Sequence, residues 1–140
     1  MDHVGIVVDD LAAAMEFFVA LGLEETGRQS VEGESVDRII GLEGARSELA
    51  FVQTPDGHGR VELVEFHSPP YAGERSPEPS NAPGIRHVTF AVDDLDTVLS
   101  DIRDHGGELV GEVQNYENVY KLCYVRGPAG IIVELAEKLA

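Results

Sequence analysis

Two histidines and two glutamates in this chain have the residue types and the spacing that metal chemistry requires. His3 and His87 each begin an apolar run that ends in Asp-Asp-Leu, in the stretches "HVGIVVDDL" and "HVTFAVDDL". Glu62 and Glu134 each stand second in a shared Val-Glu-Leu-x-Glu pattern. Imidazole nitrogens and carboxylate oxygens together suit Zn²⁺, Ni²⁺, Co²⁺, Mn²⁺ or Fe²⁺. The four residues are therefore a candidate set of metal ligands.

Each of these residues lies in a predicted strand, where alternation decides which face a side chain occupies. His3 shares a face with Gly5, and His87 shares a face with Thr89. The bulkier alternate positions are expected to pack on a helix, so the histidines point to the other face, beside small residues. One strand histidine or glutamate alone is usually solvated or hydrogen-bonded. Because two carboxylates buried without a cation would repel each other and lose hydration, the interpretation depends on all four residues together.

The elements that would position these residues occur twice along the chain. In each half, a strand of alternating apolar residues leads into an Asp-Asp pair, which offers an N-cap to a helix. Helical spacing of apolar residues follows and ends before Gly22 in the first half and Gly106 in the second. Three shorter strands complete each half, near 27–32, 47–54 and 60–66 and near 108–113, 119–126 and 131–136. The pattern predicts an α+β fold built from two tandem βαβββ modules, as in a duplicated unit.

A loop divides the two modules. The stretch "HSPPYAGERSPEPSNAPG" is rich in proline, glycine, serine and charge, which is typical of a connection and not of a packed element. We therefore expect module 1 at residues 1–66, a linker at 67–84 and module 2 at 85–140.

Composition narrows the classes of function. The net charge of −16 argues against nucleic acid and anionic membranes, which attract basic surfaces. The single cysteine cannot form an internal disulfide, and this favours a reducing compartment. The chain begins without the basic and apolar regions of a signal peptide, and it has no apolar run near the ~20 residues of a membrane span. We therefore expect a cytoplasmic protein that binds a small molecule.

Four stretches carry a resemblance to a known family: "DHVGIVVDDL", "GRVELVEF", "GIRHVTFAVDDLD" and "GPAGIIVELAE". They resemble the vicinal oxygen chelate superfamily, which includes glyoxalase I, methylmalonyl-CoA epimerase, extradiol dioxygenases and the fosfomycin and bleomycin resistance proteins. The resemblance implies that the paired βαβββ modules form a cupped mixed sheet around a divalent metal. The family's ligand positions, on the first and last strand of each module, fall here on His3, Glu62, His87 and Glu134.

The set of four ligands favours one branch of this superfamily. A His-Glu-His-Glu set resembles glyoxalase I of the bacterial type, with the epimerase close to it. This implies a metal-dependent lyase or isomerase, in which a Lewis-acidic metal stabilises an enediolate or enolate while a carboxylate moves a proton next to a carbonyl. Glu134 is the first candidate for that base and Glu62 the second, and the residues themselves do not rank them physically.

Other chemistries of the superfamily remain alternatives. A binding protein of the bleomycin resistance type would hold a metabolite or drug without turnover. Ring-cleaving dioxygenases and thiol transferases of the fosfomycin resistance type resemble this chain in fold but use three protein ligands. A fourth ligand at Glu62 would occupy a coordination position that a dioxygenase keeps open for catechol and O₂.

Basic residues are the candidates for binding an anionic substrate. Glutathione and coenzyme A adducts are anionic and require cationic contacts. Arg38 in "SVDRIIG", and Lys121 and Arg126 on either side of a predicted strand, are the strongest candidates among the 10 lysines and arginines.

Assembly is a separate expectation. The linker is long enough for the modules to pair within one chain or between two chains. Because bacterial relatives are commonly homodimers, we expect a homodimer in which the His–Glu pair of module 1 from one chain meets the pair of module 2 from the other.

Overall fold

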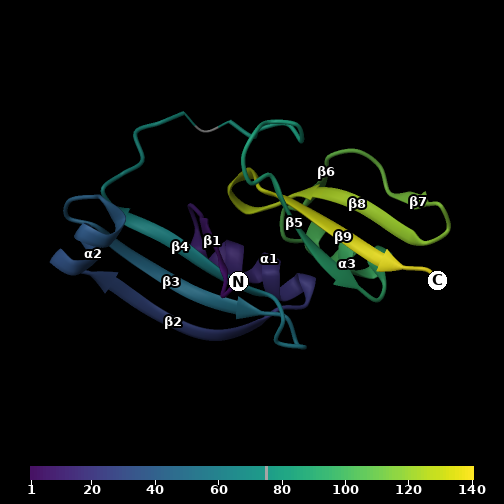
Figure 1. Cartoon of the computed structure of the whole chain (residues 1–140), viewed down its shortest axis with the longest axis horizontal. Helices are drawn as coiled ribbons and strands as arrows, with labels where there is room; N and C mark the ends of the chain where they lie inside the picture. Colours follow the sequence, from purple (N-terminus) through teal and green to yellow (C-terminus); the bar gives the residue numbers. More distant parts are fainter. Residues whose placement is uncertain (75) are drawn as a thin grey trace. The chain divides into compact units, whose positions relative to one another are not determined.

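The computed structural model describes residues 1–74 and 76–140, and these fall into two compact units (Figure 1). We call them unit 1, Met1–Glu74, and unit 2, Arg75–Ala140. Each unit contains its own mixed sheet with a helix on one face, so the predicted α+β class is confirmed.

Unit 1 has a four-stranded sheet and two helices. In chain order its elements are β1 (Val4–Val7), α1 (Leu11–Leu21), β2 (Glu24–Glu32), α2 (Glu34–Ile40), β3 (Arg46–Gln53) and β4 (Arg60–Ser68). The strand order is β1-β4-β3-β2, with β1 parallel to β4 and the other neighbours antiparallel. The first and last strands of the unit are therefore adjacent, which brings their side chains together. Helix α2 adds an element to the predicted βαβββ order.

Unit 2 repeats this plan with shorter middle strands. Its elements are β5 (His87–Val92), α3 (Leu95–Arg103), β6 (Glu108–Leu109), β7 (Gln114–Tyr116), β8 (Tyr120–Arg126), the 3₁₀ turn η1 (Pro128–Gly130) and β9 (Ile132–Lys138). The order is β5-β9-β8-β6, with β7 also paired to β8, and β5 runs parallel to β9. The single strand expected near 108–113 is thus replaced by two short strands.

The second aspartate of each Asp-Asp pair is the N-cap of the main helix of its unit, as predicted. The Asp10 carboxylate accepts a hydrogen bond from the Ala13 amide at 3.0 Å, and Asp94 accepts one from the Thr97 amide at 3.1 Å. These bonds satisfy main-chain donors that the first helical turn leaves free. Helix α1 ends before Gly22, whose φ of 122° is one that residues with a side chain rarely adopt.

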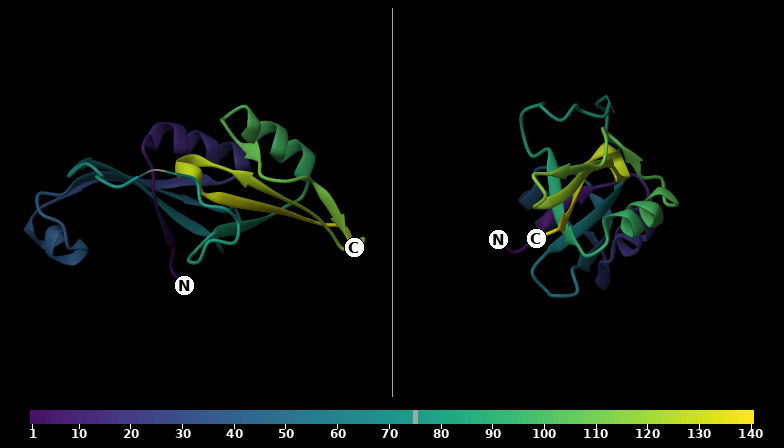
Figure 2. Two further views of the ribbon diagram at one scale, coloured as in Figure 1. Left: turned by 90° about the horizontal axis from the view of Figure 1, so that it is seen from above. Right: turned by 90° about the vertical axis from the view of Figure 1, so that its right-hand side faces the viewer.

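The helices decide which sheet face is buried. Figure 2 shows α1 and α3 each lying along one face of the sheet of its own unit. Ile6 and Leu63 are buried on the helix side of unit 1, and Phe90 and Leu135 are buried in unit 2. Because neighbouring strand residues alternate, the adjacent positions of β4 and β9 point to the face that the helix leaves open. The polar residues of interest lie on that open face.

Among the described residues, none of the helices combines the length and apolar character that a membrane span requires.

Candidate metal centre

Unit 1 places a histidine beside a glutamate on its open face. The register pairs Gly5 of β1 with Glu62 of β4, and His3 comes just before β1 on the same side as Gly5. The Nε2 atom of His3 lies 3.6 Å from Oε2 of Glu62. The two side chains are 34% and 23% exposed, so a small ligand has access to both.

Unit 2 repeats the arrangement on β5 and β9. Here Thr89 is paired with Glu134, and the Nε2 atom of His87 lies 3.5 Å from Oε2 of Glu134. The side chains are 40% and 19% exposed. The structure therefore brings each candidate histidine next to the candidate glutamate of its own unit, through the same atoms.

The two nitrogen–oxygen separations fit a pair of metal ligands. Both are too long for a good hydrogen bond. Two donors that each lie about 2.0–2.2 Å from one tetrahedral ion are roughly 3.3–3.6 Å apart, which agrees with both pairs. An imidazole nitrogen with a carboxylate oxygen is also the donor chemistry that suits transition metals.

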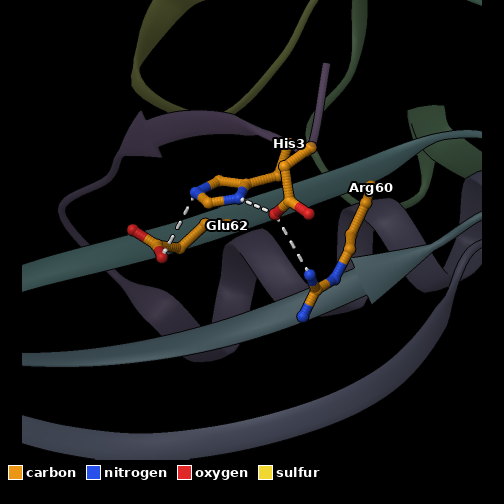
Figure 3. A network of polar contacts seen from close by, with 4 residues as sticks. His3, Arg60 and Glu62 are labelled. Carbon is orange, nitrogen blue, oxygen red and sulfur yellow. Dashed lines mark hydrogen bonds and ion pairs between the residues drawn. The ribbon is translucent and has the colours of Figure 1, made fainter.

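The other ring nitrogen of each histidine has its own partner. In unit 1, Nδ1 of His3 lies 2.6 Å from Oδ2 of Asp2 (Figure 3). This hydrogen bond, with a smaller effect of the Arg60 charge, holds the pKa of Asp2 below its usual value. In unit 2, Nδ1 of His87 lies 3.4 Å from the Tyr124 hydroxyl. Metal-binding histidines generally engage their second nitrogen in this way, which leaves Nε2 for the ion.

An aromatic residue lies across the sheet from each glutamate. Phe51 is the register partner of Glu62, and Tyr124 is the partner of Glu134. The His3 and Phe51 rings are 5.3 Å apart and nearly perpendicular, and the His87 and Tyr124 rings are 5.1 Å apart at 35°. Reasoning from the sequence did not find these two residues. The signal was present, because each is the aromatic residue nearest the middle of the strand before its glutamate.

A cavity of about 420 Å³ opens beside Glu134 within unit 2. This volume lies at the lower end of the range for small-molecule sites. Most of its lining comes from β7, β8 and the segment between β6 and β7, and none of the described residues that line it is a lysine or an arginine. The lining residues are Ser80, Val110, Gly111, Glu112, Gln114, Leu122, Cys123, Tyr124 and Glu134.

Two of the three predicted substrate-binding cations pair with carboxylates elsewhere. Arg38 lies on α2, is exposed, and pairs with Glu34 one turn earlier. Lys121 lies one strand position from Leu122, which faces the cavity, and its Nζ is 2.5 Å from Oδ2 of Asp96. That hydrogen bond raises the pKa of Lys121.

The third cation, Arg126, is used within unit 2. Its Nη1 donates to the main-chain carbonyls of Glu78 and Gly130, both at 2.9 Å. It thus joins the loop before β5 to the turn before β9. The substrate-binding roles of Arg38, Lys121 and Arg126 stay predictions.

A further group of possible ligands lies on the other face of β4. His67 Nε2 is 3.4 Å from Glu48 and 3.8 Å from Glu65, and the ligand atoms of all three lie within 4.8 Å of one another. Glu48 and Glu65 face each other across β3 and β4, where like charges are destabilising. The sequence interpretation placed His67 at the start of the linker and missed this cluster, which depends on strand pairing.

The chain matches a family over most of its length. Residues 2–124 match the sequence model of the Glyoxalase/Bleomycin resistance protein/Dioxygenase superfamily. A solved structure of a glyoxalase family protein from Bacillus cereus is 48% identical, with a TM-score of 0.94, and the match covers 100% of this chain and 94% of that one.

Two more distant structures show the same fold. A variant of glyoxalase I from Zea mays has a TM-score of 0.67 at 17% identity, over 100% of this chain and 47% of that one. A variant of the fosfomycin resistance protein FosX from Listeria monocytogenes has a TM-score of 0.58 at 15% identity, over 99% and 91%. The FosX structure holds manganese(II) and 1S,2S-dihydroxypropylphosphonic acid. At such identities the likeness concerns the fold alone.

Proposed function

Because the chain belongs to the Glyoxalase/Bleomycin resistance protein/Dioxygenase superfamily, we propose that it is a metal-dependent lyase or isomerase of the glyoxalase I type. The observation that carries the proposal is the repeated contact between a histidine Nε2 and a glutamate Oε2, at 3.6 Å in unit 1 and 3.5 Å in unit 2. A binding protein without a metal would have no need for two such pairs in equivalent register.

His3, Glu62, His87 and Glu134 would hold the divalent ion, with one His–Glu pair from each unit. Zn²⁺, Ni²⁺, Co²⁺, Mn²⁺ and Fe²⁺ all suit this donor set. When bound, the ion would act as a Lewis acid toward a substrate carbonyl oxygen. Two neutral imidazoles and two carboxylates balance its charge, so the loaded site needs no further counter-ion.

Glu134 would take a proton from the carbon next to the carbonyl and return it to a neighbouring position. Its position in the lining of the 420 Å³ cavity supports this role, because a general base must reach the substrate. The Thr89 hydroxyl donates to Oε2 of Glu134 at 2.7 Å, which fixes the carboxylate and leaves Oε1 for proton transfer. Glu62 is the alternative base, since it holds the equivalent place in unit 1.

Metal content tests the first part of the proposal. We expect the purified protein to bind about one divalent ion for each set of four ligands and to gain thermal stability when Zn²⁺, Ni²⁺ or Co²⁺ is added. The His67→Ala variant is the matched control, because it removes the alternative cluster with Glu48 and Glu65. The assignment would be refuted if the wild-type protein bound no metal and gained no stability. It would also be refuted if the wild type were stabilised by the metal but the His67→Ala variant were not.

Proton transfer tests the second part. We expect methylglyoxal with a suitable thiol, or an epimerisable acyl thioester, to exchange the proton next to its carbonyl with deuterium from D₂O. Proton NMR follows this exchange directly, and comparison of the two substrate types separates the glyoxalase reaction from the epimerase reaction. Ligand binding without any exchange would favour a binding protein.

The homodimer belongs to the same proposal. Light scattering of the metal-loaded protein measures its mass against 15.1 kDa for one chain. A monomer that retains the metal would contradict the arrangement in which two chains share the ligands.

A further inference from the structure

We infer that Asp2 and Arg60 are positioning residues that fix the ring of His3, so that the two histidines differ as ligands. The inference rests on the proposed metal site and deepens it, because it concerns what holds one ligand in place. Figure 3 shows His3 and Arg60 on either side of the carboxylate that both contact, with Glu62 beyond the far edge of the ring.

Asp2 determines which ring nitrogen of His3 carries the proton. Oδ2 of Asp2 lies 2.6 Å from Nδ1, and an ionised carboxylate only accepts hydrogen bonds. Nδ1 must therefore carry the hydrogen of the neutral ring, and Nε2 keeps its lone pair. That lone pair is on the ring edge that lies 3.6 Å from Glu62, where the ion is proposed to bind.

Arg60 holds the carboxylate of Asp2 in place. Its side chain is 76% exposed, and an exposed ion pair alone contributes little to stability. However, the same Oδ2 also accepts a hydrogen bond from Nη1 of Arg60 at 3.3 Å. Arg60 is itself fixed, because its guanidinium carbon lies 4.1 Å from the centre of the Phe51 ring.

Phe51 connects Arg60 back to His3. The Phe51 ring that contacts Arg60 also packs edge-on against His3, with the ring centres 5.3 Å apart and the ring planes at 88°. Asp2, His3, Phe51 and Arg60 therefore form a closed ring of neighbours, each touching two others. A closed ring restrains the imidazole about both its axis and its tilt, which a single hydrogen bond would not do.

Unit 2 offers a direct comparison. Arg86 precedes His87 as Asp2 precedes His3, and Ile132 begins β9 as Arg60 begins β4. Arg86 donates to the carbonyls of Ala82 and Pro83, both at 3.0 Å, so it turns to the linker. Nδ1 of His87 meets a hydroxyl at 3.4 Å, and a hydroxyl can donate or accept. Its contact therefore leaves the proton position on the His87 ring open.

Loss of Asp2 or Arg60 should weaken the binding of Zn²⁺. A carboxylate behind a ligating imidazole fixes its orientation and raises its basicity, and loss of such a partner typically lowers metal affinity about 10–100-fold. We expect Asp2→Ala to have an effect of this size on Zn²⁺ binding. Arg60→Met should have a smaller effect in the same direction, because Asp2 remains but loses its support.

The experiment has two readouts on the full-length protein. The first is ring ¹⁵N NMR of histidine-labelled, metal-free protein at a pH where His3 is neutral, which reports the hydrogen on Nδ1 or Nε2. The second is Zn²⁺ affinity by competition with a chromophoric chelator. Glu43→Gln serves as the control, because it removes one exposed acidic charge elsewhere in unit 1.

The result that supports the inference is a single Nδ1–H form of His3 in the wild type, mixed forms in Asp2→Ala, and an affinity loss that the control does not share. Wild-type-like spectra and an affinity within twofold in Asp2→Ala would overturn it. If the wild type binds no Zn²⁺, the proposed function fails, but the NMR readout still decides whether Asp2 and Arg60 fix His3. A circular dichroism melt identifies any variant that fails to fold, and Asp2→Asn, which keeps the shape, then replaces it.

Discussion

The His–Glu pairs of the two units use the same atoms but are supported in opposite ways. In unit 1 the histidine is held, because Asp2 binds Nδ1 of His3 at 2.6 Å, while the position beside Glu62 is Gly5, which has no side chain. In unit 2 the glutamate is held, because the Thr89 hydroxyl binds it at 2.7 Å, while Nδ1 of its histidine lies 3.4 Å from a hydroxyl. The candidate ligand types are thus repeated, but the residues that support them are not.

A duplicated module has parts that both copies share and parts that differ between them. The strand order that puts the first and last strands side by side is common to both units, and so are the ligand types. The residues around them sit at equivalent register positions with different chemistry, such as Arg60 against Ile132 and Phe51 against Tyr124. Among the candidate ligands, a histidine is therefore held by a hydrogen bond in unit 1 and a glutamate in unit 2.

The largest expected effect comes from removing the base. Glu134→Gln should lower the rate of proton exchange by about 10²–10⁴-fold, because a positioned general base contributes that much. Glu62→Gln should have a smaller effect on the rate, since Glu134 and not Glu62 lines the cavity of unit 2. Deuterium incorporation followed by NMR measures both variants. A larger loss in Glu62→Gln would reverse the assignment of the base.

The next effect concerns the support of the glutamate in unit 2. Thr89→Val keeps the shape of the side chain but removes the hydrogen bond to Glu134, and we expect roughly tenfold weaker Co²⁺ binding. Isothermal titration calorimetry measures the change. Unchanged affinity would show that Thr89 does not support the ligand.

Adding a hydroxyl at the equivalent position tests the same comparison in unit 1. Gly5→Thr would place a hydroxyl beside Glu62, and a Cβ at this position meets no atom within 4 Å. We expect tighter Co²⁺ binding in this variant and recovery of part of the lost affinity in the Gly5→Thr, Thr89→Val double variant. A threonine also suits a strand better than glycine, so the melting temperature should not fall.

A smaller effect is expected from the tyrosine of unit 2. Tyr124→Phe makes this position match Phe51 of unit 1 and removes a hydroxyl that lies 3.4 Å from Nδ1 of His87. Because this is a long contact, Zn²⁺ affinity should change by only about twofold to threefold. A loss as large as that of Asp2→Ala would mean that the two histidines are supported equally.

The smallest expected effect is that of the helix cap Asp94 on the melting temperature, and it depends on pH. The hydrogen bonds from Thr97 lower the pKa of Asp94 from its usual value of 3.8. The ionised carboxylate therefore stabilises the folded protein fully at pH values above 3.8, and this stabilisation is lost as the pH falls through the lower pKa of the folded state. Asp94→Ala should therefore lower the melting temperature by a few degrees at pH 7, and the difference should vanish near pH 2. Asp10→Ala, at the start of α1, is the matched variant. A difference that persists unchanged at low pH would contradict the role of the ionised carboxylate.

Much of the scaffold could be predicted from the sequence because its signals are local. The Asp-Asp pairs predicted helix starts, and Asp10 and Asp94 cap their helices as expected. Alternation also predicted that His3 and His87 lie on the face opposite the buried residues. Helix α2 escaped prediction because it is short and buries no residue, so it lacks an apolar stripe.

The sequence alone determined which residue types recur, the two βαβββ halves and the face of each candidate ligand, because all of these follow from the period of a strand or a helix. Their neighbours depend on how the strands pair in the folded units. Arg60 meets Asp2 across 58 positions, and Thr89 meets Glu134 across 45. Such contacts depend on strand register, which local periodicity does not contain, and so the different supports of two similar His–Glu pairs became visible only in the folded units.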